Sequence, residues 1–124
     1  MAATVLIVED DPGLRDMLEQ LLHLQGFAPI TASDGRQALD FLRMGGHADV
    51  ILLDLVMPVM SGREFSLEQQ RDERLSPIPV VVMTGTTVRV APSDLHETAW
   101  FPKPLDLPRL LDTLRSICGT SLSA

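Results

Sequence analysis

Short runs of apolar, often β-branched residues recur along the chain and dominate its pattern of hydrophobic and polar positions. Runs of this kind are typical of strands that are buried on both faces of a parallel sheet. They predict strands at residues 4–8, 49–53 and 79–83, and less regular stretches at 28–31 and 99–102 complete a set of five.

Amphipathic segments lie between the predicted strands. After the first strand, apolar residues recur from Leu14 to Leu22 at a spacing of i, i+3, i+4, i+7 and i+8, which marks one apolar helix face. Pro12 suits the first turn of this helix, and Gly26 suits its end. Further helices are expected at residues 34–44, 63–74 and 106–118.

The segment between the fourth and fifth strands departs from this regularity. Residues 86–90 have no helical period, and Pro92 would break a helix there. Ser93 could cap a short turn that runs to Thr98. The fourth helix in chain order is therefore expected to be short, shifted or irregular.

Strands that alternate with helices predict an α/β fold, here a doubly wound, five-stranded parallel sheet with right-handed crossovers. A chain of 124 residues has the size of one compact domain. We expect residues 1–124 to form a single domain with its core at about 4–118. Ligands of such sheets bind at the carboxyl ends of the strands, near a topological switch point.

Acidic residues gather at two of these strand ends. The first strand is followed by Glu9, Asp10 and Asp11, and the third is followed by Asp54. Clustered carboxylates repel one another unless protons or a cation compensate their charge. A hard divalent cation with oxygen ligands is the natural solution, and Mg²⁺ typically takes one or two carboxylates together with water and phosphate.

A hydroxyl and a cation stand at the remaining strand ends. Thr84 ends the fourth strand, and Lys103, the only lysine of the chain, follows the fifth. The hydroxyl could bond a phosphoryl oxygen, and the lysine would neutralise charge. The whole set favours phosphoryl transfer, in which positioning and charge neutralisation supply most of the catalysis. A carboxylate nucleophile that forms an aspartyl phosphate is established chemistry.

Four motifs carry a resemblance to a known family. They are VEDDP at residues 8–12, LDLVMP at 53–58 with Ser61 and Gly62, VMTG at 82–85, and WFPKP at 100–104. Each motif is weak alone, but the four in this order at predicted strand ends are very specific. The sequence resembles a response-regulator receiver domain of two-component signalling, which has a flavodoxin-like fold, over nearly the whole chain.

The resemblance implies a role for each acidic residue. Asp54 corresponds to the phosphoacceptor and is also a metal ligand. Asp10 corresponds to a direct ligand of Mg²⁺ or Mn²⁺, and Glu9 binds the ion directly or through water. The backbone carbonyl of Val56 completes the protein ligands. Asp11 is either the N-cap of the first helix or a further member of the site.

The same resemblance assigns the switch and the partners. Thr84 and Lys103 should contact the phosphoryl group, and Gly85 should leave access to Asp54. Thr84 and Trp100 stand where the family has its switch residues, although Trp100 could equally be an ordinary packing residue. The implied partners are a histidine kinase or phosphotransfer protein and a downstream protein target, with the chain a monomer or weak homodimer.

Charge and composition exclude several other functions. The net charge of −7 and the pI of about 4.7 oppose direct binding to nucleic acid. One cysteine, Cys118, permits no intrachain disulfide. Neither a secretory signal nor a membrane-spanning apolar run is present, so a cytoplasmic protein is expected.

Two alternatives remain beside the phosphoacceptor interpretation. A phosphatase acting on external substrates would carry a second acid shortly after the nucleophile, whereas Asp54 is followed by the residues LVMP. We therefore expect no enzyme beyond the catalysis of its own phosphorylation and dephosphorylation. A receiver-like interaction module that is never phosphorylated is the second alternative, kept open by the irregular segment before the fifth strand.

Overall fold

The computed structural model describes residues 2–57, 59–85 and 98–119. Five parallel strands form one sheet in the order β2-β1-β3-β4-β5. They are β1 (Thr4–Val8), β2 (Ala28–Ala32), β3 (Val50–Asp54), β4 (Val80–Thr84) and β5 (Ala99–Pro102). The predicted parallel α/β sheet is confirmed. Because β1 lies between β2 and β3, the strand order reverses there and creates a switch point.

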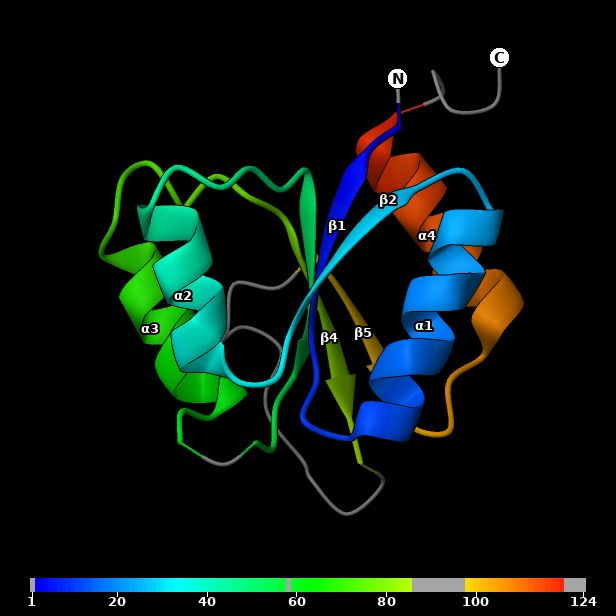
Figure 1. Cartoon of the computed structure of the whole chain (residues 1–124), viewed down its shortest axis with the longest axis horizontal. Coiled ribbons are helices and arrows are strands. Elements are labelled where there is room, and N and C mark those ends of the chain that lie inside the picture. Colours follow the sequence, from blue (N-terminus) through cyan, green and yellow to red (C-terminus); the bar gives the residue numbers. More distant parts are fainter. Residues whose placement is uncertain (1, 58, 86–97, 120–124) are drawn as a thin grey trace.

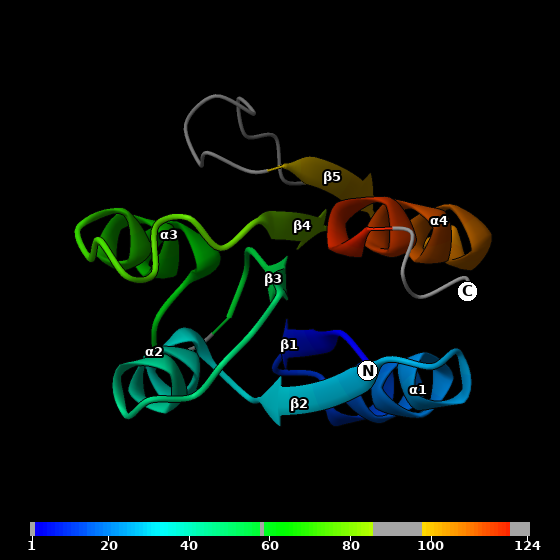
Figure 2. The ribbon, with the colours of Figure 1, turned by 90° about the horizontal axis from the view of Figure 1, so that it is seen from above.

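Helices cover both faces of the sheet. Figures 1 and 2 show α1 (Pro12–Leu24) and α4 (Leu107–Cys118) on one face, and α2 (Gly35–Arg43) and α3 (Gly62–Gln70) on the other. Each face has its own buried apolar cluster. Val5 and Ile7 of β1 belong to the α1/α4 cluster, whereas Leu6 and Val8 belong to the α2/α3 cluster. The continuous apolar strand is thus explained by the alternation of its side chains between two covered faces.

The third helix ends earlier than its sequence predicts. A helix over residues 63–74 was expected, but α3 ends at Gln70. The buried Gln69 side chain donates from Nε2 to the carbonyl oxygens of Leu75 and Ile78, both at 3.0 Å. These two bonds fold the following segment back under the helix. The local pattern could not show them because they depend on a side chain that bonds backbone further along the chain.

Two features of the loops shape the carboxyl edge of the sheet. Asp11 caps α1, since its carboxylate accepts a hydrogen bond from the backbone N–H of Gly13 at 3.0 Å. Gly62 starts α3 so close to the end of β3 that a Cβ there would lie 2.7 Å from the Asp54 carbonyl oxygen. Glycine is therefore required for this close approach.

Two further sequence predictions concern the irregular fourth helix and the absence of a membrane-spanning segment. The irregular fourth helix was expected between residues 86 and 98, and all of this segment but Thr98 lies outside the described residues. In the described ranges, no helix combines the length and the apolar character needed to cross a lipid bilayer.

Candidate functional site

Three carboxylates meet at the switch point. Glu9 and Asp10 directly follow β1, and Asp54 ends the neighbouring strand β3. One carboxylate oxygen from each of the three lies within 4.8 Å of the other two. Glu9 is 0% and Asp54 is 3% exposed, whereas Asp10 is exposed. The cluster therefore has a buried floor and one side that is open to solvent.

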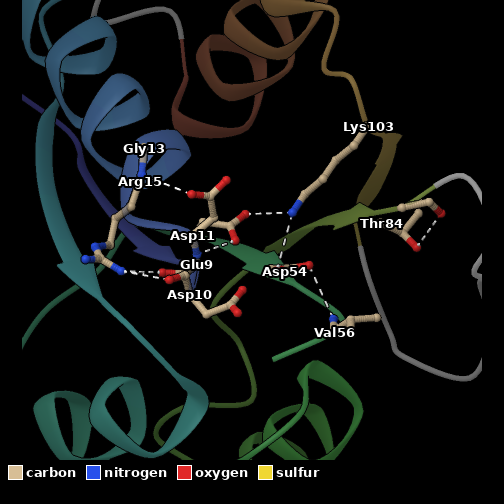
Figure 3. Close-up of polar contacts among 10 residues, drawn as sticks. Glu9, Asp10, Asp11, Gly13, Arg15, Asp54, Val56, Thr84 and Lys103 are labelled. Atoms are coloured by element: carbon tan, nitrogen blue, oxygen red, sulfur yellow. Dashed lines mark hydrogen bonds and ion pairs between the residues drawn. The ribbon is translucent and has the colours of Figure 1, made fainter. Parts of the chain in front are cut away.

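Lys103 supplies the positive charge beside this floor (Figure 3). Its Nζ lies 2.8 Å from Glu9 Oε1 and 3.4 Å from Asp54 Oδ2. Its backbone N–H donates to the carbonyl of Thr84 at 2.7 Å, which fixes the start of the side chain just beyond β5. Burial by itself lowers the pKa of Lys103, but the hydrogen bond to Glu9 and the charge of Asp54 outweigh it and raise the pKa. Lys103 is therefore held in its charged form.

The ionised form of the Asp54 carboxyl group is disfavoured at this position. Burial raises its pKa to about 7, and the nearby charge of Glu9 acts in the same direction. Lys103 and the backbone N–H of Val56, which donates to Asp54 Oδ1 at 3.3 Å, oppose that rise. Near neutral pH this carboxylate thus lacks enough positive charge around it.

Glu9 has both of its carboxylate oxygens engaged. Oε1 accepts from Lys103, and Oε2 accepts from the backbone N–H of Asp11 at 3.1 Å. The Asp10 carboxylate, by contrast, makes no hydrogen bond to any other described residue. Asp10 at the rim is exposed, and Asp54 at the floor lacks enough positive charge around it. Their carboxylates are oxygen donors of the kind that Mg²⁺ prefers. The donor set therefore fits a hard divalent cation.

Thr84 is buried at the end of β4 but is not directed at the acidic cluster. Its Oγ1 donates to the carbonyl oxygen of Gly85 at 3.3 Å. Figure 3 shows the hydroxyl turned away from Asp54 in this state. A Cβ at Gly85 would meet no atom of the described residues within 4 Å, so packing there does not itself demand glycine.

Trp100 lies apart from the carboxylates, on the edge strand β5. It is 41% exposed, while the next residue, Phe101, is buried in the α1/α4 cluster. Together with Pro104 and Arg109, it lines a surface cavity of about 260 Å³. The Lys103–Pro104 peptide bond is cis.

Comparison with known proteins gives this arrangement its context. The family model "Response regulator receiver domain" matches residues 5–115. The polar-differentiation response regulator DivK of Brucella ovis is 31% identical over 122 residues, covering 96% of this chain and 98% of DivK. The transcriptional regulatory protein CpxR of Escherichia coli is 34% identical over 118 residues, covering 94% of this chain and 50% of CpxR.

Solved structures agree with the sequence relatives. The chemotaxis protein CheY4 of Vibrio cholerae is 30% identical, with a TM-score of 0.84 over 94% of this chain and 99% of that chain. Fold and strand order define a flavodoxin-like α/β domain with acidic residues at its switch point. More narrowly, the chain belongs to the family of response regulator receiver domains, which act in two-component signalling. Receiver domains bind Mg²⁺ at an acidic pocket, and the three carboxylates described above form an acidic cluster that could hold a metal ion.

Sequence reasoning missed two contacts at this site. The specific pairing of Lys103 with Glu9 was not predicted, because the lysine was expected to neutralise charge at the strand ends and to contact a phosphoryl group, without a particular carboxylate as its partner. The guanidinium of Arg15, which donates to the backbone carbonyls of Glu9 and Asp10, was also missed. Its position one turn into the helix after an acidic loop was the available signal.

Proposed function

We propose that this chain is a phosphoacceptor receiver domain in which Asp54 receives a phosphoryl group from a histidine kinase or phosphotransfer protein. The observation that carries the proposal is the meeting of Asp54, Asp10 and Glu9 with Lys103 at the switch point of the sheet. Buried anionic oxygens beside a fixed cation suit phosphoryl transfer, where positioning and charge compensation do most of the work.

The cation would be Mg²⁺ or Mn²⁺, held by the carboxylates of Asp10 and Asp54 and by the backbone carbonyl of Val56. Glu9 would contribute directly or through water. When bound, the cation neutralises charge on the phosphoryl oxygens and on the acidic cluster. The raised pKa of Asp54 supports this assignment, because the group needs additional positive charge to act as an ionised nucleophile near neutral pH.

The chain's own residues would then carry the reaction. An Asp54 carboxylate oxygen attacks phosphorus, the bond from phosphorus to the donor atom breaks, and an acyl phosphate remains on Asp54. Lys103, which is only 3.4 Å from Asp54 Oδ2 before the reaction, pairs with the phosphoryl oxygens. The backbone N–H of Val56 holds Oδ1 and so orients the carboxylate plane.

The response would begin at Thr84. Its hydroxyl is held by a long bond of 3.3 Å to Gly85 and would exchange that acceptor for a phosphoryl oxygen. The movement would change the packing beneath β5 and the orientation of Trp100, the second proposed switch residue. Phosphorylation adds roughly −1.5 to −2 charges by analogy with other phosphorylated side chains, enough to bias an existing two-state equilibrium.

Several coarser features of the protein complete the proposal. We propose one receiver domain over residues 1–124, with its core at about 4–118, acting in the cytoplasm as a monomer or weak homodimer. Its partners would be the phosphoryl donor and a downstream protein, without direct contact to nucleic acid or membrane, in keeping with a net charge of −7. Its catalysis would be limited to its own phosphorylation and dephosphorylation.

Intact mass measurement after incubation with acetyl phosphate and Mg²⁺ tests the proposal. We expect one added phosphoryl group that requires Mg²⁺ and is absent from Asp54→Asn. An adduct of equal size in Asp54→Asn would assign the phosphoacceptor to another residue. If no adduct forms under conditions that rule out rapid hydrolysis of the phosphorylated protein, the interaction module that is never phosphorylated would be favoured.

A further inference from the structure

We propose that Arg15 is a positioning residue that presets the acidic loop for the divalent cation, an inference that rests on the function proposed above. The guanidinium Nη1 donates to the backbone carbonyl of Glu9 at 2.9 Å and lies 3.4 Å from that of Asp10. Figure 3 shows the side chain reaching back from α1 to the end of β1. It bonds carbonyl oxygens only, so it leaves the Asp10 carboxylate available and does not compete with Lys103 for the Glu9 carboxylate.

The loop between β1 and α1 depends on few other contacts. The backbone N–H of Glu9 donates to the Ala32 carbonyl at 3.1 Å, and the backbone N–H of Arg15 donates to the Asp11 carbonyl at 2.9 Å. These bonds hold the two ends of the loop. Between them, Arg15 is the hydrogen-bond partner that Asp10 has within the described part of the chain. Apart from the bond of the Asp11 N–H to Glu9 Oε2, which closes the turn around Asp10, the position of the rim residue therefore depends on this guanidinium.

Charge adds a second reason for this assignment. Three consecutive acids, Glu9, Asp10 and Asp11, lie within the reach of one helix start, and like charges at this spacing repel. Lys103 compensates the inner pair of Glu9 and Asp54, whereas Arg15 is half-buried on the outer side of the loop. Arginine remains charged at all working pH values, so this compensation persists whichever group the loop binds.

Preorganisation links these contacts to cation affinity. A site whose ligands already stand in place loses less conformational freedom when the ion binds. Partners that orient metal ligands without touching the metal typically change its affinity by 10–100-fold when they are removed. Arg15 has the geometry of such a partner, acting through the backbone of two residues that carry candidate ligands.

Mg²⁺ titration by isothermal calorimetry tests the proposal on the whole chain. Arg15→Met removes both the charge and the donors, and we expect it to bind Mg²⁺ at least about tenfold more weakly than wild type. Arg15→Lys keeps the charge but has a shorter side chain, and we expect its affinity for Mg²⁺ to lie between those of wild type and Arg15→Met. Arg115→Met is the matched control. It removes the same charge and also a 2.7 Å hydrogen bond to the Gln25 side chain, which lies at the opposite end of α1 from the acidic cluster. The control should bind Mg²⁺ like wild type.

The outcomes separate positioning from other roles. If Arg15→Met binds Mg²⁺ as tightly as Arg115→Met, the proposal is overturned, even if the variant unfolds at lower urea concentration. If Arg15→Lys matches wild type, charge alone suffices and positioning is overturned. Should Arg15→Met fail to fold, the comparison of Arg15→Lys with wild type and Arg115→Met decides the question.

Failure of the underlying function would look different. A wild-type chain that binds Mg²⁺ but takes no phosphoryl group on Asp54 would overturn the proposed function and leave the assignment of Arg15 to cation binding intact. A wild-type chain that binds no Mg²⁺ would overturn both. Weak Mg²⁺ binding by Arg15→Met beside normal binding by Arg115→Met supports the positioning role.

Discussion

Lys103 lies closer to Glu9 than to Asp54. Its Nζ is 2.8 Å from Glu9 Oε1 and 3.4 Å from Asp54 Oδ2. The carboxylate that holds the lysine most closely is thus not the one proposed to be phosphorylated. Since Glu9 is fully buried, this ion pair provides the positive charge that allows a carboxylate to remain at the floor of the site.

The burial of Glu9 predicts a large effect of Lys103→Met on the metal-free protein. The variant leaves the Glu9 carboxylate without its cation, and we expect a loss of about 2–4 kcal/mol in the free energy of unfolding. The double variant Glu9→Gln with Lys103→Met should recover much of this loss, because it removes the buried charge as well. Urea unfolding in EDTA measures both. A double variant that is no more stable than Lys103→Met would contradict the explanation.

The raised pKa of Asp54 predicts how stability depends on pH without a cation. A buried acid with a pKa near 7, against an ordinary value of 3.8, binds a proton more tightly folded than unfolded. Its contribution is fully present below pH 3.8, declines through the interval above it and is lost once the pH passes 7. Between pH 5 and 8 we expect wild type in EDTA to lose roughly 1–3 kcal/mol more stability than Asp54→Asn.

Urea unfolding of wild type and Asp54→Asn at four pH values checks this difference. Saturating Mg²⁺ should reduce the slope for wild type, because the cation replaces the proton as the counter-charge. Parallel pH profiles of the two proteins in EDTA would show that Asp54 ionises in the folded state at its ordinary pKa. Removal of the metal is therefore expected to cost most stability at the alkaline end of the range.

Val59 occupies a backbone conformation that disfavours its side chain. Its φ is 68°, and the residue is 78% exposed. A β-branched residue is strained in the left-handed region, whereas asparagine tolerates it. We expect Val59→Asn to raise the free energy of unfolding by about 1 kcal/mol. Val56→Asn, at another exposed valine of the same loop without a positive φ, is the control and should not be stabilised.

The hydrogen bonds of the Gln69 side chain predict that this residue stabilises the fold away from the acidic cluster. Its Nε2 serves the carbonyls of Leu75 and Ile78, while its Oε1 is buried without a hydrogen-bond partner in the described part of the chain. Gln69→Ala leaves both carbonyls without this donor, and we expect a loss of about 2–3 kcal/mol. Gln70→Ala, the adjacent exposed residue, is the matched control for urea unfolding. Equal effects of the two changes would rule out the proposed role.

The pattern of hydrophobic and polar residues was enough to predict the sheet, the order of its strands and helices along the chain, and the gathering of chemistry at its carboxyl edge. Apolar runs such as that of β1 predict buried strands because a parallel sheet that is covered on both faces is lined mainly by apolar side chains. Parallel strands end at one edge, so Asp54 and the acids after β1 were predicted to meet, and the carboxylate oxygens of Glu9, Asp10 and Asp54 do so, whereas Asp11 caps α1.

Contacts between residues far apart in the sequence could not be predicted from any local pattern. Gln69 ends α3 early through bonds to backbone six and nine residues on. Lys103 pairs with Glu9 across 94 positions, and Arg15 reaches back to two carbonyls. Periodicity reports which face of an element is buried, whereas these bonds depend on the reach of single side chains once the elements are packed. The strand ends bring the charged groups together, and the packing of the elements determines which ion pair or hydrogen bond each group forms.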